Sequence, residues 1–191
     1  MTSSATGIHP PRLCAPNLAV ERREACLRDG TDLEFETVLS GEDTVDFVMR
    51  ARAAGFFVRL LFVSTGDAAI NSSRIARRVM LGGHEVPIGK IISRYSKSIA
   101  NCALLASHVD RLYVYDNSAE DADPTLCFRA SEGLLTKRYR KPPAWSQIVF
   151  ERIAEAPYST LDIAPNFTVA VTSQISPAAR ASPLSDRCRM R

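Results

Sequence analysis

The chain of 191 residues is long enough for one domain with a hydrophobic core. Its hydrophobic fraction of 46% and charged fraction of 24% are typical of a soluble globular protein. The formal net charge of +3 is too small for composition to predict binding to nucleic acid or to membranes.

The cysteines and the N-terminal residues carry neither a metal-binding nor an export signal. No CxxC pair occurs, so the odd, scattered set predicts reduced thiols and no metal site; the five are Cys14, Cys26, Cys102, Cys127 and Cys188. The opening MTSSATGIHPPRLC lacks the apolar core of a signal peptide, and the longest apolar run, GFFVRLLFV, is too short to span a bilayer. We therefore expect a cytoplasmic protein with no membrane partner.

Helical and strand patterns alternate through the first half of the chain. Residues 1–16 contain three prolines and predict a disordered lead-in. Asn17 can cap a helix over 18–29, which Gly30 ends. The apolar spacing then predicts a strand over 33–38, a helix over 44–54, a continuously apolar strand over 56–63 and a helix over 68–81.

Two glycines and a proline separate that helix from the next one. Gly82 and Gly83 end the first helical pattern, and Pro87 suits the first turn of a second helix over 88–106. The later patterns predict strands at 111–117 and 125–130, a short helix at 141–155 and a loose tail at 157–191. Strands separated by helices indicate an α/β fold, with a mainly parallel sheet and flanking helices, in one domain over 17–156.

Five strings stand in a fixed order along the chain: FETVLSG, AGFFVRLLFV, RIARRVMLGGHEVP, SRYSKSIANC and RLYVYDNS. Together they resemble the zeta-toxin-type P-loop kinases and their stand-alone relatives, the UDP-N-acetylglucosamine kinase-like proteins, over residues 18–152. The resemblance implies a partial P-loop kinase-like, three-layer fold with a helical lid. It also implies ATP and Mg²⁺ as cofactors and phosphoryl transfer to a small acceptor such as a sugar nucleotide. Such transfer depends on positioning and on positive charge around the phosphates.

The same resemblance implies a set of binding residues. The phosphate-facing arginines of the lid and the nucleotide-binding segment correspond to Arg74, Arg78, Arg94 and Asn117. The acceptor-binding motif corresponds to Glu36 and Thr37. The planar guanidinium group suits phosphate oxygens. We therefore expect the three arginines to point toward one concave site near the strand end that carries Glu36.

Three parts of the kinase chemistry are missing from the sequence. No G-x-x-x-x-G-K-[ST] loop is present, and no glycine-rich loop precedes any lysine. Pro11 stands where the family has a candidate catalytic Asp, and Val38 replaces the last threonine of the FETT motif. We therefore expect no catalytic residues and no ATP turnover from this chain. A truncated gene product, a wrongly assigned start and a degenerate relative would all produce this pattern.

The same residues also have purely structural interpretations. The arginines at 74, 77 and 78 suit a solvated helix face, and Gly82 and Gly83 suit a helix C-cap. Residues 136–145 combine four basic side chains with Tyr139 and Trp145, which suits nucleic-acid contact, but a solvated surface segment is the favoured interpretation.

Three functions therefore remain open: a kinase-like phosphotransferase, a non-catalytic module that binds a nucleotide or sugar nucleotide, and a non-functional fragment. We expect no nucleic-acid partner, and the sequence does not indicate an antitoxin partner.

Overall fold

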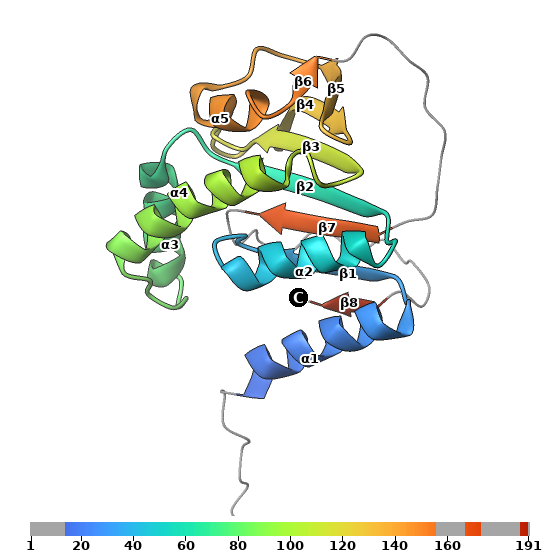
Figure 1. Ribbon diagram of the computed structural model, residues 1–191. Coiled ribbons are helices and arrows are strands. Elements are labelled where there is room, and N and C mark those ends of the chain that lie inside the picture. The colour runs from blue at the N-terminus through green and yellow to red at the C-terminus, as the bar shows by residue number, and fades with distance from the viewer. Residues whose placement is uncertain (1–13, 156–166, 173–187, 191) are drawn as a thin grey trace, which may run out of the picture.

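The computed structural model describes residues 14–155, 167–172 and 188–190 (Figure 1). Its helices are α1 (Cys14–Asp29), α2 (Glu42–Ala53), α3 (Ala68–Met80), α4 (Ile88–Leu105), the short 3₁₀ helix η1 (Ala144–Ser146) and α5 (Gln147–Phe150). Its strands are β1 (Leu33–Thr37), β2 (Val58–Ser64), β3 (Arg111–Asp116), β4 (Thr125–Ser131), β5 (Leu134–Arg138), β6 (Ala154–Glu155), β7 (Phe167–Thr172) and β8 (Cys188–Met190). The described strands form one sheet in the order β6-β5-β4-β3-β2-β7-β1-β8.

The sheet has a parallel part and an antiparallel part. Strands β3, β2, β7, β1 and β8 run parallel to one another, whereas β4 is antiparallel to both β3 and β5. The prediction of an α/β fold is confirmed. The sheet, however, is mixed, so the prediction of a mainly parallel sheet is wrong for the sheet as a whole and describes only the strands β3, β2, β7, β1 and β8.

A tight turn is the reason for the antiparallel part. Glu132 and Gly133 join β4 to β5, and both residues have positive φ, 51° and 75°. Two such residues between paired strands are typical of a type I′ hairpin turn. Ser131 pairs with Leu134 directly across the turn. Since a two-residue turn reverses the direction of the chain, β5 is antiparallel to β4.

Strand β7 lies between β1 and β2, far from both in sequence. It pairs in parallel with β1 on one side and with β2 on the other. β7 and β8 both come from the stretch 157–191, which was predicted to be a loose tail; 157–166, 173–187 and residue 191 lie outside the described residues. The centre of the parallel part is therefore filled by a strand from the C-terminal end of the chain (Figure 1).

Both ends of the described region differ from the sequence prediction. Helix α1 begins at Cys14, so Asn17 lies inside the helix instead of capping it. Pro16 falls in the first turn, where its missing N–H breaks no helical hydrogen bond. The helix predicted over 141–155 is shorter, because only 144–150 are helical.

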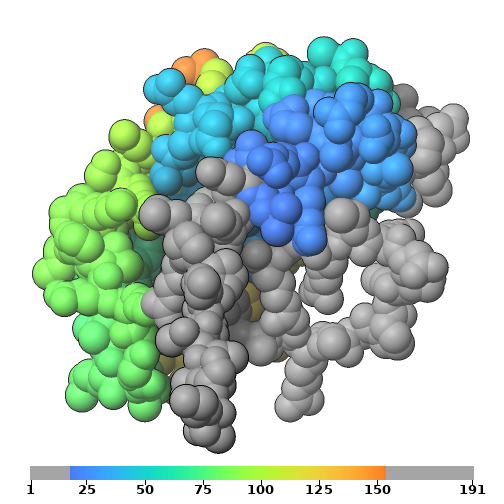
Figure 2. Space-filling view, turned by 90° about the horizontal axis from the view of Figure 1, so that it is seen from below, coloured from blue at the N-terminus to red at the C-terminus, as the bar shows by residue number. Residues whose placement is uncertain are grey.

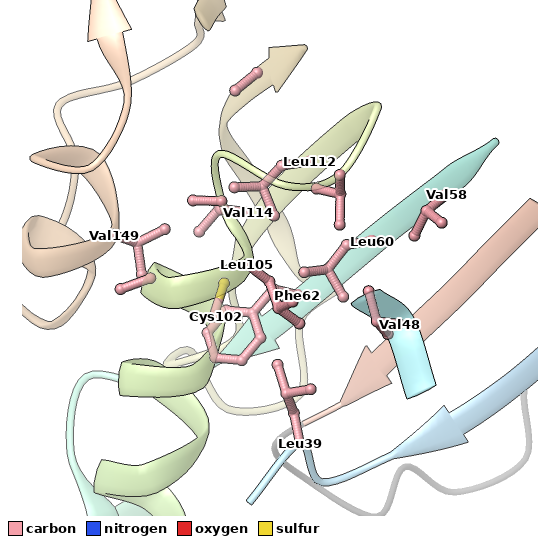
Figure 3. Packing of buried hydrophobic residues seen from close by; sticks show 14 of the residues in the cluster. Leu39, Val48, Val58, Leu60, Phe62, Cys102, Leu105, Leu112, Val114 and Val149 are labelled. Atoms are coloured by element: carbon pink, nitrogen blue, oxygen red, sulfur yellow. The ribbon is translucent and has the colours of Figure 1, made fainter. Parts of the chain in front are cut away.

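The core lies between the sheet and the helices α2 and α4, which pass in front of it in Figure 1. Alternate residues of the central strands point into this core, as the period of two requires. Those of β2 and β3 are Val58, Leu60, Phe62, Leu112 and Val114, all fully buried. Val48 of α2 and the residues Cys102 and Leu105 of α4 pack against them (Figure 3).

Helices α3 and α4 form a hairpin at the end of the sheet toward which the parallel strands point (Figure 1). In Figure 2 this hairpin, in green, lies to one side of α1 and α2, in blue and cyan. The connection 81–87 is largely exposed, with Gly82 at a φ of +89°, as predicted for a link between two helices. None of the helices in the described residues combines the length and apolarity needed to cross a membrane.

Candidate functional site

The carboxyl ends of β1, β2 and β3 lie at one edge of the sheet because these strands run in the same direction. Open α/β sheets bind ligands at this edge. Polar residues follow each strand there: Glu36 and Thr37 at β1, the segment 65–67 after β2, and 116–118 at β3. This edge, together with the adjacent α3–α4 hairpin, is the candidate site.

A buried network fixes the start of α3 to the end of β2. The Thr65 hydroxyl donates to Oδ1 of Asn71 at 2.9 Å, and the Tyr95 hydroxyl donates to the Thr65 carbonyl at 2.9 Å. Thr65 and Asn71 are buried. Asp67 caps α3 by accepting the N–H of Ala69 at 2.9 Å. The carboxylate of Asp67 therefore occupies the helix N-terminus, which in phosphate-loop proteins receives the ligand phosphate.

A second set of contacts joins the ends of β2 and β3. The Gly66 N–H donates to the Ser118 hydroxyl at 2.7 Å, and Ser118 in turn donates to the Asp116 carboxylate. Asn117, one of the predicted nucleotide-binding residues, donates its backbone N–H to the Ser64 carbonyl at 2.7 Å. This contact belongs to the backbone of Asn117, and the prediction for its side chain stays a prediction.

The first turns of α3 are tied to the segment that follows β3. Arg74 Nη2 donates to the Ala119 carbonyl at 2.7 Å. Arg77, which was not among the predicted site residues, forms an ion pair with Glu120. Arg78 and Arg94 are half-buried, one near the end of α3 and the other in the second turn of α4. The structure thus brings one predicted arginine, Arg74, to the end of β3.

Glu36 and Thr37 lie elsewhere along the same edge. Phe35 is buried in the core, so its neighbour Glu36 points to the opposite face, where it is exposed. Thr37 Oγ1 accepts the N–H of Leu39 at 3.2 Å. Since β7 lies between β1 and β2, two strand spacings, about 10 Å, separate Glu36 from the β2 end. The described contacts bring neither Glu36 nor Thr37 to Arg74.

Asp116 is the centre of a cluster that the sequence did not reveal. Its Oδ1 accepts the indole N–H of Trp145 at 3.3 Å, and its Oδ2 lies 3.9 Å from Arg140 Nη1. Burial raises the pKa of the neighbouring Cys127 thiol, and the Asp116 carboxylate raises it further. A polar residue after a strand was the only sequence signal for this cluster, since Trp145 is 29 positions away.

The strand ends are acidic, whereas the hairpin is basic. Burial raises the pKa of Tyr95, and the carboxylates of Asp67 and Asp116 raise it further, so both acids lie near its hydroxyl. Between positions 74 and 97 the sequence has six Lys or Arg residues and one acid, Glu85. An anion would therefore be repelled at the strand ends and attracted to the hairpin.

Comparisons of this chain with protein-family models, with curated proteins and with solved structures found no match.

Proposed function

We propose that this chain is an α/β domain, similar to the zeta-toxin-type kinases, that binds a nucleotide or sugar nucleotide through its phosphates and does not transfer them. The observation that carries the proposal is the position of α3. Its Arg74 is hydrogen-bonded to the segment after β3, so the basic hairpin stands beside the carboxyl edge of the parallel strands.

The proposed phosphate position is against the hairpin, near Arg77, Arg78 and Arg94. Guanidinium groups donate paired hydrogen bonds to phosphate oxygens. The Arg77–Glu120 pair does not block this, because both side chains are exposed (65% and 61%) and such surface pairs contribute little. A phosphate that carries two charges competes well with one exposed carboxylate.

The residues at the strand ends do not fit a catalytic site for ATP and Mg²⁺. Asp67 caps α3, and Asp116 accepts from Trp145 and Ser118. In the part of the chain that the structure describes, no group of three or more His, Cys, Asp or Glu residues could hold a metal ion. The residues after β7, SQIS, contain neither glycine nor lysine. We therefore derive no phosphoryl-transfer step for this chain.

The proposal is tested by calorimetric titration with ADP, a UDP-sugar and inorganic tripolyphosphate. The wild-type chain is expected to bind at least one of them, with an affinity that falls as salt rises. Arg78→Ala should weaken binding by up to about tenfold, because one charge-assisted contact is lost and is partly screened by solvent. Incubation with ATP and UDP-sugars should yield no phosphorylated product.

Arg22→Ala is the matched control. Arg22 is exposed on α1, away from the hairpin, and its loss changes the net charge by the same amount. Equal weakening by both substitutions would mean that the anion responds only to net charge, and turnover of ATP by the purified chain would overturn the non-catalytic part of the proposal.

A further inference from the structure

The sheet has a second face, opposite the one that α2 and α4 cover. Residues that alternate with the core residues point to it. On β3 these include Tyr113 and Tyr115, both half-buried. Tyr113 pairs with Arg129 of β4, and Arg129 pairs with Lys137 of β5, so the three side chains form a row across three strands.

Tyr139 joins this row from the segment after β5. Lys137 Nζ lies 4.8 Å from the centre of the Tyr139 ring, which places both on the same face. Tyr113 and Tyr115 are two positions apart on β3 and so share a face. Burial raises the pKa of Tyr115, and the neighbouring hydroxyls of Tyr113 and Tyr139 raise it further. We call Tyr113, Tyr115, Arg129, Lys137 and Tyr139 the tyrosine face.

The cations of the tyrosine face have no acidic partner. Within the described residues, neither Arg129 nor Lys137 takes part in an ion pair. Arg129 Nε is also shielded from solvent and has no acceptor in the described chain. Side-chain cations that no carboxylate neutralises keep their full positive charge, which suits an anionic ligand.

We propose that the tyrosine face binds single-stranded nucleic acid. Unpaired bases stack on aromatic rings at the surface of an open sheet, while nearby cations hold the backbone phosphates. Three adjacent tyrosines, one of them 44% exposed, provide the rings, and Arg129 and Lys137 provide the charge. A duplex is a poorer fit because its bases are already stacked and paired.

The proposal uses none of the hairpin residues, so it does not depend on the proposed anion site. The mild net charge does not conflict with it, because the total of +3 averages over the whole molecule. The strand register places these cations and aromatic rings on one face, although they lie up to 26 positions apart in the sequence.

The test is fluorescence anisotropy of the full chain with a labelled, unstructured oligonucleotide of about 12 nucleotides, made as DNA and as RNA. Binding should weaken with salt. Tyr139→Ala should weaken it by about fivefold or more, the effect of losing one stacked base, and Tyr139→Phe should retain it. Lys137→Ala should reduce the slope of log K against log salt by about 0.7.

Arg138→Ala is the matched control. Arg138 pairs with the buried Phe128, so it points to the other face of β5 while carrying the same charge one position away. The proposal predicts that Arg138→Ala leaves binding nearly unchanged. The proposal would be overturned by equal losses of affinity for Lys137→Ala and Arg138→Ala, by tighter binding of the duplex form, or by no binding at low salt. Circular dichroism checks the fold of every variant.

Discussion

One residue, Asp110, connects the start of β3 to β2, β4 and α2. Asp110 is 6% exposed and precedes β3. Its Oδ2 accepts the N–H of Val58 at the start of β2 at 2.7 Å, and its Oδ1 lies 3.1 Å from Arg52 Nη2 near the end of α2. Its carbonyl accepts the Ser131 hydroxyl at 3.0 Å. The carboxylate therefore links the start of β2 to α2, and the backbone carbonyl of the same residue links the start of β3 to β4.

Asp110→Ala is expected to lower the free energy of unfolding by about 3 kcal/mol, because it leaves a buried N–H without an acceptor and removes the carboxylate nearer to Arg52, the other being Glu132 at 3.9 Å. Urea denaturation followed by circular dichroism measures the change. Asp46→Ala is the control: Asp46 pairs with Arg50 at 2.8 Å but is 66% exposed, so about 0.5 kcal/mol is expected. Similar losses for the two variants would contradict this account of Asp110.

The site residues that the sequence missed share one property at this scale. Trp145 and Asn71 stand in none of the five strings, Tyr95 stands beside the predicted Arg94, and each of the three acts through a partner on another element. Arg74 was found because it belongs to a recognisable string, but its acceptor, the Ala119 carbonyl, has no side-chain signature. Every residue has a backbone carbonyl, so the sequence does not indicate which one accepts a hydrogen bond.

Among the elements, the β4–β5 hairpin departs most from the prediction. The sequence predicted β4 but not β5 (LLTKR), which is short and carries two basic residues, and which the structure shows to be largely exposed. Its turn signal, Glu-Gly between Ser131 and Leu134, is weaker than Asn-Gly or Asp-Gly. The exposed strand and the weak turn together explain why the antiparallel part was not foreseen.

Gly133→Ala is expected to destabilise the protein by about 1–2 kcal/mol. Alanine disfavours the φ of 75°, and a Cβ at this position would lie 3.2 Å from Cα and Cβ of Ser107. Thermal unfolding measures the effect. Gly89→Ala is the comparison: nothing lies within 4 Å of its Cβ position, and in α4 alanine should stabilise by up to about 1 kcal/mol. A neutral Gly133→Ala would mean that the turn adjusts freely.

The position of β7 decides how the whole molecule holds together. β1 and β2 do not pair with each other, and β7 completes the backbone hydrogen bonds between them. The sheet therefore depends on a segment that lies more than a hundred positions after β2 in sequence. Such a non-local pairing is formed late and at a cost in chain entropy.

A chain that ends at Glu155 lacks β7 and is expected to aggregate or to lose cooperative unfolding, because β1 and β2 then expose unpaired edges. A chain that ends at Thr172 keeps β7 and, of the described elements, loses β8, which pairs with β1 at the edge of the sheet, so it should remain folded with a lower midpoint. Size-exclusion chromatography and thermal unfolding distinguish the two. Cooperative unfolding of the shorter chain at the wild-type midpoint would show that β7 is dispensable.

Local patterns determined the elements of this protein, and long-range pairing determined their arrangement. The alternation around Leu60 and Phe62, the glycines after α3 and Pro87 before α4 fixed the type and approximate limits of the elements from β1 to β4, because hydrophobic periodicity and backbone preference act over a few residues. Only the tertiary structure decided four features: the direction of β5, the insertion of β7 between β1 and β2, the contact of Asp116 with Trp145, and the tyrosine face. Each depends on which strand lies beside which, and strand neighbours are chosen by the free energy of the assembled sheet, which no short stretch of sequence contains.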